Sequence, residues 1–70
     1  MVSFFEQSGR FVRCETRAHA DGTYELLVID EDGHEEVEQF TAAESLDKRL
    51  AELESHYRAS GWFGPYGRRS

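Results

Sequence analysis

The chain's cysteine and histidines are the side chains whose types could support catalysis. A nucleophilic mechanism would need Cys14 as the nucleophile, with His19 or His34 as a base within hydrogen-bond reach. Cys14 lies inside an alternating stretch typical of a strand, while the two histidines lie next to turns at opposite ends of the next strand. The sequence contains no G-x-S-x-G, phosphate loop, Gly-rich dinucleotide turn or H-E-x-x-H motif. We therefore predict that the protein is not an enzyme.

The acidic segment Asp30-Glu31-Asp32-Gly33 carries the oxygen ligands that calcium prefers. An EF-hand loop needs glycine at its sixth position and acidic ligands at its first and twelfth positions. With Gly33 at the sixth position, Val28 and Gln39 occupy the two ends, so the ligand set is incomplete. Cys14 is the only cysteine, which excludes a four-thiolate zinc site and an intramolecular disulfide. We expect a hairpin turn here, and no metal or cofactor.

The charge is uneven along the chain. The formal net charge is -6, and residues 21–56 carry twelve acidic side chains against Lys48 and Arg49. This negative segment repels phosphate and argues against broad binding of nucleic acids or anionic membranes. One alternative is single-stranded nucleic-acid binding, with aromatic rings for stacking and arginines from residues 10–18 and from the C-terminal tail. Those arginines are Arg10, Arg13, Arg17, Arg68 and Arg69.

Length and hydropathy bound the class of protein. Seventy residues make one small domain, 1–70, which buries only about 60% of the surface of its unfolded chain. The longest apolar run, Leu26 to Ile29, is far shorter than the roughly 20 residues that a membrane-spanning helix needs. The apolar segment 1–5 lacks the basic region, the long apolar region and the cleavage site of a secretory signal. These features predict a cytoplasmic protein with no membrane span.

Turn signals divide the first 40 residues into strands. Residues 10–18 alternate between apolar and charged side chains, as in a half-buried strand. Asp21-Gly22 is a strong hairpin signal, and the segment 23–30 that follows is rich in β-branched and aromatic residues. A second turn ending at Gly33 leads to residues 34–40, whose glutamates suit an exposed edge strand. We predict a three-stranded antiparallel sheet over residues 10–40, with 23–30 as its central strand. Residues 1–9 are expected to form a flap or a short extra edge strand.

Residues 41–61 carry the signals of a helix. Thr41 and Glu44 have the spacing of a capping box, and Gly61 is a typical C-terminal glycine. An apolar stripe follows the helical repeat; its members are Ala43, Leu46, Leu50, Leu53 and Tyr57. The predicted fold class is α+β, in the order β-β-β-α, with one long helix across one face of the sheet. Residues 62–70 are expected to form an aromatic and Arg-bearing tail.

The hairpin loops decide which side chains share a face of the sheet. Three-residue loops ending at Gly22 and Gly33 place one set of side chains under the helix, whereas two-residue loops would exchange some of the faces. The helix-facing set is Val12, Cys14, Thr16, Ala18, Tyr24, Leu26, Val28 and Phe40. The opposite face then holds an apolar stripe with a charged border. Its members are Phe11, Leu27, Ile29 and Val37.

Three aromatic residues of the tail extend this candidate site. Trp62 and Phe63 could instead fold back over the open end of the core, whereas an exposed aromatic segment would dock on a partner. The predicted interaction residues are Phe11, Leu27, Ile29, Val37, Trp62, Phe63 and Tyr66. The leading hypothesis is a non-catalytic protein-interaction or accessory module, acting as a homodimer or with another protein partner. In the homodimer hypothesis, charged side chains form a complementary rim around the stripe.

Overall fold

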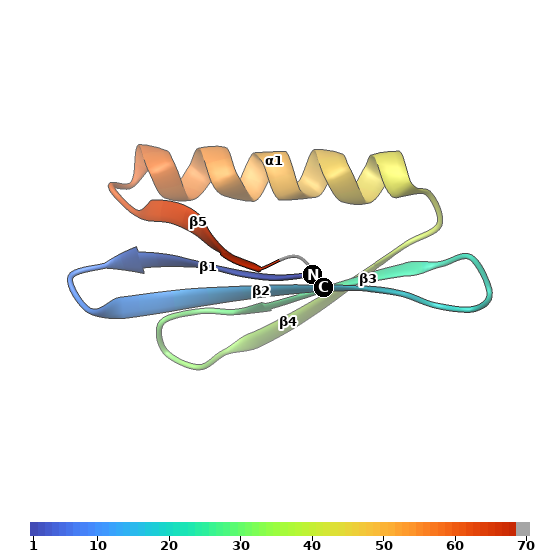
Figure 1. Cartoon of the computed structure of the whole chain (residues 1–70), viewed down its shortest axis with the longest axis horizontal. Coiled ribbons are helices and arrows are strands. Elements are labelled where there is room, and N and C mark those ends of the chain that lie inside the picture. The colour runs from blue at the N-terminus through green and yellow to red at the C-terminus, as the bar shows by residue number, and fades with distance from the viewer. Residues whose placement is uncertain (69–70) are drawn as a thin grey trace.

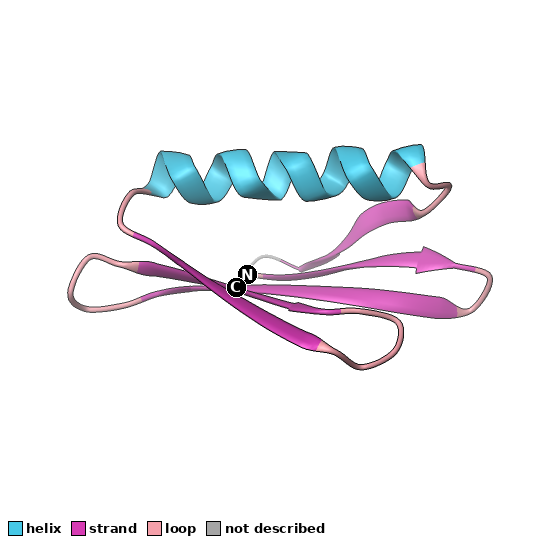
Figure 2. Cartoon of the chain, turned by 180° about the vertical axis from the view of Figure 1, so that it is seen from behind, coloured by secondary structure: helices cyan, strands magenta, loops and turns pink. Residues whose placement is uncertain are grey.

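The part of the chain that the structure describes forms a five-stranded antiparallel sheet covered on one face by a single helix (Figure 1). The computed structural model describes residues 1–68. Its elements are β1 (Val2–Gln7), β2 (Arg10–Ala18), β3 (Tyr24–Ile29), β4 (Glu35–Phe40), α1 (Ala43–Ala59) and β5 (Phe63–Arg68). The strands lie in the order β4-β3-β2-β1-β5, and the helix lies as a second layer above them (Figure 2). The predicted α+β class is confirmed.

The sheet is larger than the predicted three-stranded meander. Residues 2–7 form a full strand, β1, rather than a flap, and residues 63–68 form the edge strand β5 rather than a tail. The central strand is consequently β2, with two strands on each side, and not the segment 23–30. Gly67 permits the close approach of β5 to β1, since a Cβ atom there would lie 2.4 Å from the Val2 carbonyl oxygen. The last two residues of the predicted tail lie outside the described residues.

Both hairpins of the predicted meander have three-residue loops, which is the first of the two alternatives that the sequence leaves open. His19 N–H donates to the Thr23 carbonyl, and Asp30 N–H donates to the His34 carbonyl, each over 2.9 Å. Cys14 pairs with Val28 in the first hairpin. In the second, residues 27 and 37 are partners, as are 24 and 40. The predicted register and face assignments of these three strands are therefore confirmed, and β4 is an edge strand as expected.

The helix is shorter than the predicted range 41–61. It runs from Ala43 to Ala59, and its N-cap is Ala42, with no side-chain hydrogen bond to the cap. The capping box predicted at Thr41 is therefore wrong, because the extended backbone of Ala42 moves the first turn one residue along the chain. Gly61 has a φ of 88° at the C-terminal end, and Trp62 N–H donates to the Tyr57 carbonyl over 2.9 Å, which is a Schellman motif.

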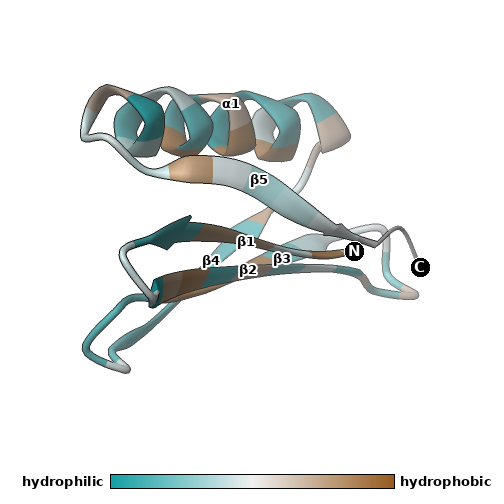
Figure 3. Ribbon diagram, turned by 60° about the vertical axis from the view of Figure 1, so that its left-hand side comes forward, coloured by the Kyte–Doolittle hydropathy of each residue, from teal (hydrophilic) through white to brown (hydrophobic). Residues whose placement is uncertain are grey.

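The core lies between the helix and one face of the sheet. It contains Phe5, Val12, Cys14, Leu26, Leu46 and Leu53, each at most 8% exposed. Leu46 and Leu53 belong to the predicted helical stripe, and Phe5 comes from the strand that the sequence left ambiguous. Trp62 packs against this core from the turn that follows the helix. Both layers are visible in Figure 3, where β5 rises from the sheet toward the C-terminal end of α1.

Candidate functional site: the open face of the sheet

The strand register places a distinct set of side chains on the face opposite the helix, called here the open face. Paired residues in neighbouring strands point to the same side, and successive residues alternate. Since Val12 and Cys14 are in the core, the odd-numbered residues of β2 belong to the open face. They are Phe11, Arg13, Glu15 and Arg17. These four side chains form the middle column of the open face, and in order along β2 they are apolar, basic, acidic and basic.

Two apolar patches flank this charged column. The first, called the β3–β4 patch, consists of Leu27, Ile29 and Val37. The second, called the β1–β5 patch, consists of Val2, Phe4, Tyr66 and the adjacent Phe11. The predicted single stripe with a charged border is therefore wrong in its layout. The addition of β1 and β5 beside β2 moves the charged residues of β2 from the border to the middle of the sheet.

The aromatic rings of the β1–β5 patch are in mutual contact. The Phe4 ring lies 5.7 Å, centroid to centroid, from the Phe11 ring in an edge-to-face arrangement, and 5.7 Å from the Tyr66 ring. The three rings come from three different strands and contact one another in favourable aromatic geometries. Val2, Phe4, Phe11 and Arg13 also line a shallow depression of about 430 Å³. The patch thus offers a preformed apolar hollow next to a cation.

The open-face side chains differ in exposure. Phe11 is 53% exposed, Val37 55% and Tyr66 48%, whereas Leu27 and Ile29 are half-buried within the face. In the central column, Arg13 Nη2 lies 3.5 Å from Glu15 Oε1, and the Glu15 side chain is only 19% exposed. Glu15 is therefore the partly desolvated charge of the column, and Arg13 remains accessible.

The tail residues of the predicted site separate in the structure. Tyr66 joins the open face as the partner of Phe4, and Phe63, which is 62% exposed, begins β5 opposite Glu6. Trp62 lies in a different place. It is half-buried against the core, with its ring 5.7 Å from the Tyr57 ring. The fold-back interpretation thus holds for Trp62 and fails for Phe63.

Sequence reasoning missed Phe4 and Val2 as members of this face. The sequence predicts a flap or a short edge strand for residues 1–9, whereas β1 is a full inner strand that adds both side chains to the open face. The alternation of Val2, Phe4 and Glu6 against Ser3 and Phe5 was the available signal.

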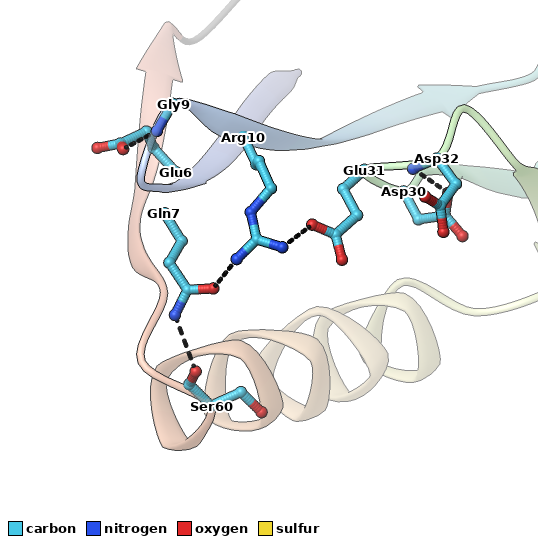
Figure 4. Close-up of polar contacts among 8 residues, drawn as sticks. All are labelled: Glu6, Gln7, Gly9, Arg10, Asp30, Glu31, Asp32 and Ser60. Atoms are coloured by element: carbon cyan, nitrogen blue, oxygen red, sulfur yellow. Dashed lines mark hydrogen bonds and ion pairs between the residues drawn. The ribbon is translucent and has the colours of Figure 1, made fainter.

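A chain of polar contacts fixes the end of the molecule where the helix stops (Figure 4). Gln7 Nε2 donates to the Ser60 carbonyl over 3.2 Å, and Arg10 Nη2 donates to Gln7 Oε1 over 3.1 Å. The other Arg10 nitrogen, Nη1, lies 2.9 Å from Glu31 Oε2. Arg10 therefore links the β1–β2 turn to the β3–β4 turn. Its guanidinium also lies 5.8 Å from the centroid of the Trp62 ring, so it is engaged on the helix side.

A cleft of about 400 Å³ separates the second half of α1 from β3 and the turn before β4. Its walls carry Asp30, Glu36 and Arg49 together with His34 and His56. The charges are of both signs, so the cleft favours no single type of ligand charge. Arg49 is already occupied, since its Nε donates to Glu38 Oε1 over 2.9 Å. Among residues 1–68, no group of three or more His, Cys, Asp or Glu side chains is placed to hold a metal ion.

In the acidic turn, residues 30–33, the first carboxylate accepts hydrogen bonds from backbone N–H groups of the turn and of the residue that follows it. Asp30 Oδ1 accepts hydrogen bonds from the Asp32 N–H over 3.0 Å and from the His34 N–H over 2.9 Å. Gly33 has a φ of 85°, as the predicted turn requires. The segment thus forms the expected hairpin turn.

The candidate catalytic residues are spread over the molecule. Cys14 is buried in the core, where burial raises the pKa of its thiol. His19 lies in the turn between β2 and β3, with its Nε2 atom 3.5 Å from Glu25 Oε2. His34 lies in the turn at the other end of β3. The two turns point to opposite ends of the molecule in Figure 1.

Burial of Cys14 predicts slow reaction with thiol reagents, because the thiolate is the reactive form. At neutral pH we expect the native protein to be labelled at least about a hundredfold more slowly than the urea-unfolded chain. The raised pKa also stabilises the fold below the ordinary thiol value of 9.0, and this contribution should be lost as the pH rises above it. A Cys14→Ala, Ser55→Cys variant, with its thiol on the exposed helix surface, is the control. Equal labelling rates for the wild type and the control would contradict the prediction.

Within residues 1–68, no helix is long and apolar enough to cross a membrane. In comparisons with known proteins, no family model matches the chain, and no similar sequence among curated proteins and no similar solved structure was found.

Proposed function

We propose that the protein is a non-catalytic protein-interaction module whose open face docks on a protein surface. The observation that carries this proposal is the exposure of large apolar side chains on one face. Phe11, Val37 and Tyr66 are each about half exposed, and all three lie opposite the helix. Clustered exposed apolar side chains rimmed by charges are typical of interaction sites on soluble domains.

The two faces of the sheet differ in what covers them, and this difference supports the proposal. The helix and Trp62 pack on one face, where Val12 and Leu26 are 1% and 0% exposed. Phe4, Phe11 and Tyr66 therefore contribute little to that core, yet their rings are held in contact with one another. Aromatic side chains bury a large area and have only two side-chain torsion angles to fix on binding, which favours their use as anchors.

A second candidate is single-stranded nucleic-acid binding on the same face. The row of Tyr66, Phe4 and Phe11 could stack bases, and Arg13 lies beside it. Glu15 and the net charge of -6 oppose this function, because they repel phosphate. Salt separates the candidates, since phosphate contacts weaken steeply between low and moderate salt, whereas apolar docking does not.

Phe11→Asp should remove the docking function without unfolding the protein. The substitution places a charge in the β1–β5 patch at a side chain that is already half exposed, so it should cost about 1 kcal/mol of stability or less. Tagged wild-type protein should retain specific proteins, identified by mass spectrometry, from an extract of the organism that encodes it. Phe11→Asp should lose them.

Ala51→Asp is the matched control, since it adds the same carboxylate to the exposed surface of α1. It should retain the same proteins as the wild type. If both variants bind like the wild type, the open face is not the docking surface. Loss of binding in both would point to a general effect of added charge.

A further inference from the structure

We propose that the open face binds a second copy of this chain, with the two β2 strands crossing antiparallel at the centre of a symmetric dimer. This inference rests on the proposed docking function and names the partner. The two-fold axis lies in the plane of the interface and runs across the strands, between Arg13 and Glu15. The argument comes from the order of side chains along β2.

The open-face column of β2 is complementary to itself when it is read in the opposite direction. In order it presents Phe11, Arg13, Glu15 and Arg17, spaced by two residues. An antiparallel copy places Arg13 against Glu15 of the partner subunit, and Glu15 against the partner's Arg13. At the two ends, Phe11 meets the partner's Arg17, a pair that allows a cation–π contact. Every residue of the column thus has an attractive counterpart.

The flanking columns match in the same arrangement. A row is a set of side chains that are paired across neighbouring strands. The axis places the row that contains Glu15 opposite the partner's row that contains Arg13. In β3 this places Leu27 against Ile29 of the partner subunit. In β1 it places Val2 against Phe4 of the partner subunit. In β4 the same axis places Val37 against Glu35 of the partner subunit. Apolar contacts therefore form on both sides of the charged centre through β3 and β1, and their burial supplies the driving force.

The competing symmetric arrangement is electrostatically unfavourable. A two-fold axis parallel to β2 would set Arg13 on the partner's Arg13 and Glu15 on the partner's Glu15. Like charges in direct opposition across an interface strongly disfavour association. The same charges that stabilise the antiparallel crossing therefore exclude the parallel one. Their main effect is on register and orientation, since desolvation offsets much of the attraction of interfacial ion pairs.

The area of the face suits a weak dimer. Five strands, about 4.8 Å apart and about 20 Å long, present a flat footprint of roughly 480 Å² before side-chain relief is counted. Two such footprints, roughly 960 Å² together, fall below the lower end of stable specific interfaces, about 1,200 Å² in total, and within the range of weak ones. We therefore expect a dimer that forms reversibly as the protein concentration is raised.

Charge exchange at the two central positions tests the arrangement. Sedimentation of the wild type over a series of concentrations should show a monomer–dimer equilibrium. Arg13→Glu and Glu15→Arg should each raise the dissociation constant by about a hundredfold or more, because each creates two like-charge contacts. Mixing the two variants should produce a heterodimer, in which both central contacts are attractive. The double variant should dimerise like the wild type, since the exchange again places opposite charges against each other at the two central contacts. Circular dichroism melts of all the variants check that each is folded.

A wild type that stays monomeric into the millimolar range would overturn the proposal, and so would single variants that dimerise as tightly as the wild type. Absence of a heterodimer in the mixture would overturn the antiparallel crossing. These failures are distinct from failure of the docking function: a monomeric wild type that still captures proteins in a Phe11-dependent manner has an open face for a different partner.

Discussion

Leu26→Ala should unfold at a much lower urea concentration than the wild type, with a loss of about 2–5 kcal/mol in the free energy of unfolding. Leu26 is 0% exposed and belongs to the core cluster with Leu46 and Leu53, so its truncation leaves a cavity. A 70-residue domain typically has about 3.5–10 kcal/mol of stability in total. The substitution should therefore remove a large part of it. Equilibrium urea unfolding, followed by circular dichroism, measures the change.

Leu27→Ala is the matched control, because it makes the same chemical change at the next residue on the opposite face. Leu27 is half-buried, so its truncation should cost clearly less than that of Leu26. Both variants should be measured at low protein concentration, where a dimer through the open face does not contribute. Equal losses for the two variants would contradict the assignment of the core to the helix-covered face.

Gly67→Ala should detach β5 from β1. A Cβ atom at this position would lie 2.4 Å from the Val2 carbonyl oxygen and 2.8 Å from the Ser3 Cα atom. Both are backbone atoms, so no change of side-chain rotamer relieves the collision. The φ of 147° adds a conformational penalty of about 1–3 kcal/mol for alanine. Hydrogen exchange of the backbone amides in β1 and β5 should accelerate strongly, while that of β3 changes little.

Gly22→Ala separates the collision from the backbone penalty. Gly22 also has a positive φ, 87°, but a Cβ atom there would have no neighbour within 4 Å. Its substitution should cost only the conformational term and leave the exchange of β5 unchanged. If Gly67→Ala behaves like Gly22→Ala, the close approach of β5 to β1 is not the constraint at this position.

The middle of the fold could be predicted because its signals are local. Asp21-Gly22 and the turn ending at Gly33 mark the two hairpins, and the length of each loop determines the register. The sequence allowed loops of two or three residues, and the structure has three in both. Once the register is known, Leu26 must face the helix and Leu27 must face away. The helical stripe is similarly local, since Leu46 and Leu53 repeat with the helical period.

The outer strands could not be predicted in the same way. The segment 63–68 contains Gly64, Pro65 and Gly67, residues that normally argue against a strand. Its pairing with β1 joins residues about 60 positions apart in the sequence, and no local sequence pattern predicts such a contact. The start of the helix was displaced for a different reason, because the backbone of Ala42 rather than the side chain of Thr41 sets the first turn.

The two unpredicted strand pairings, of β1 with β2 and of β5 with β1, also explain which residues of the candidate site the sequence did not predict. Phe11, Leu27, Ile29 and Val37 were correctly assigned to the open face from the hairpin register. Phe4 reaches the open face through the pairing of β1 with β2, and Tyr66 through the pairing of β5 with β1. The two pairings together put Arg13 and Glu15 at the centre of the sheet.

The neighbouring positions of β1 and β5 have a consequence for synthesis of the chain on the ribosome. β1 is the first strand to emerge, and β2 can pair with one of its edges soon afterwards. The other edge has no partner until residues 63–68 are made, which is roughly 3–11 s later at about 5–20 residues per second. An unpaired strand edge is a template for pairing with other chains. The nascent protein is therefore most exposed to misassembly at β1, and pairing with β5 ends that exposure.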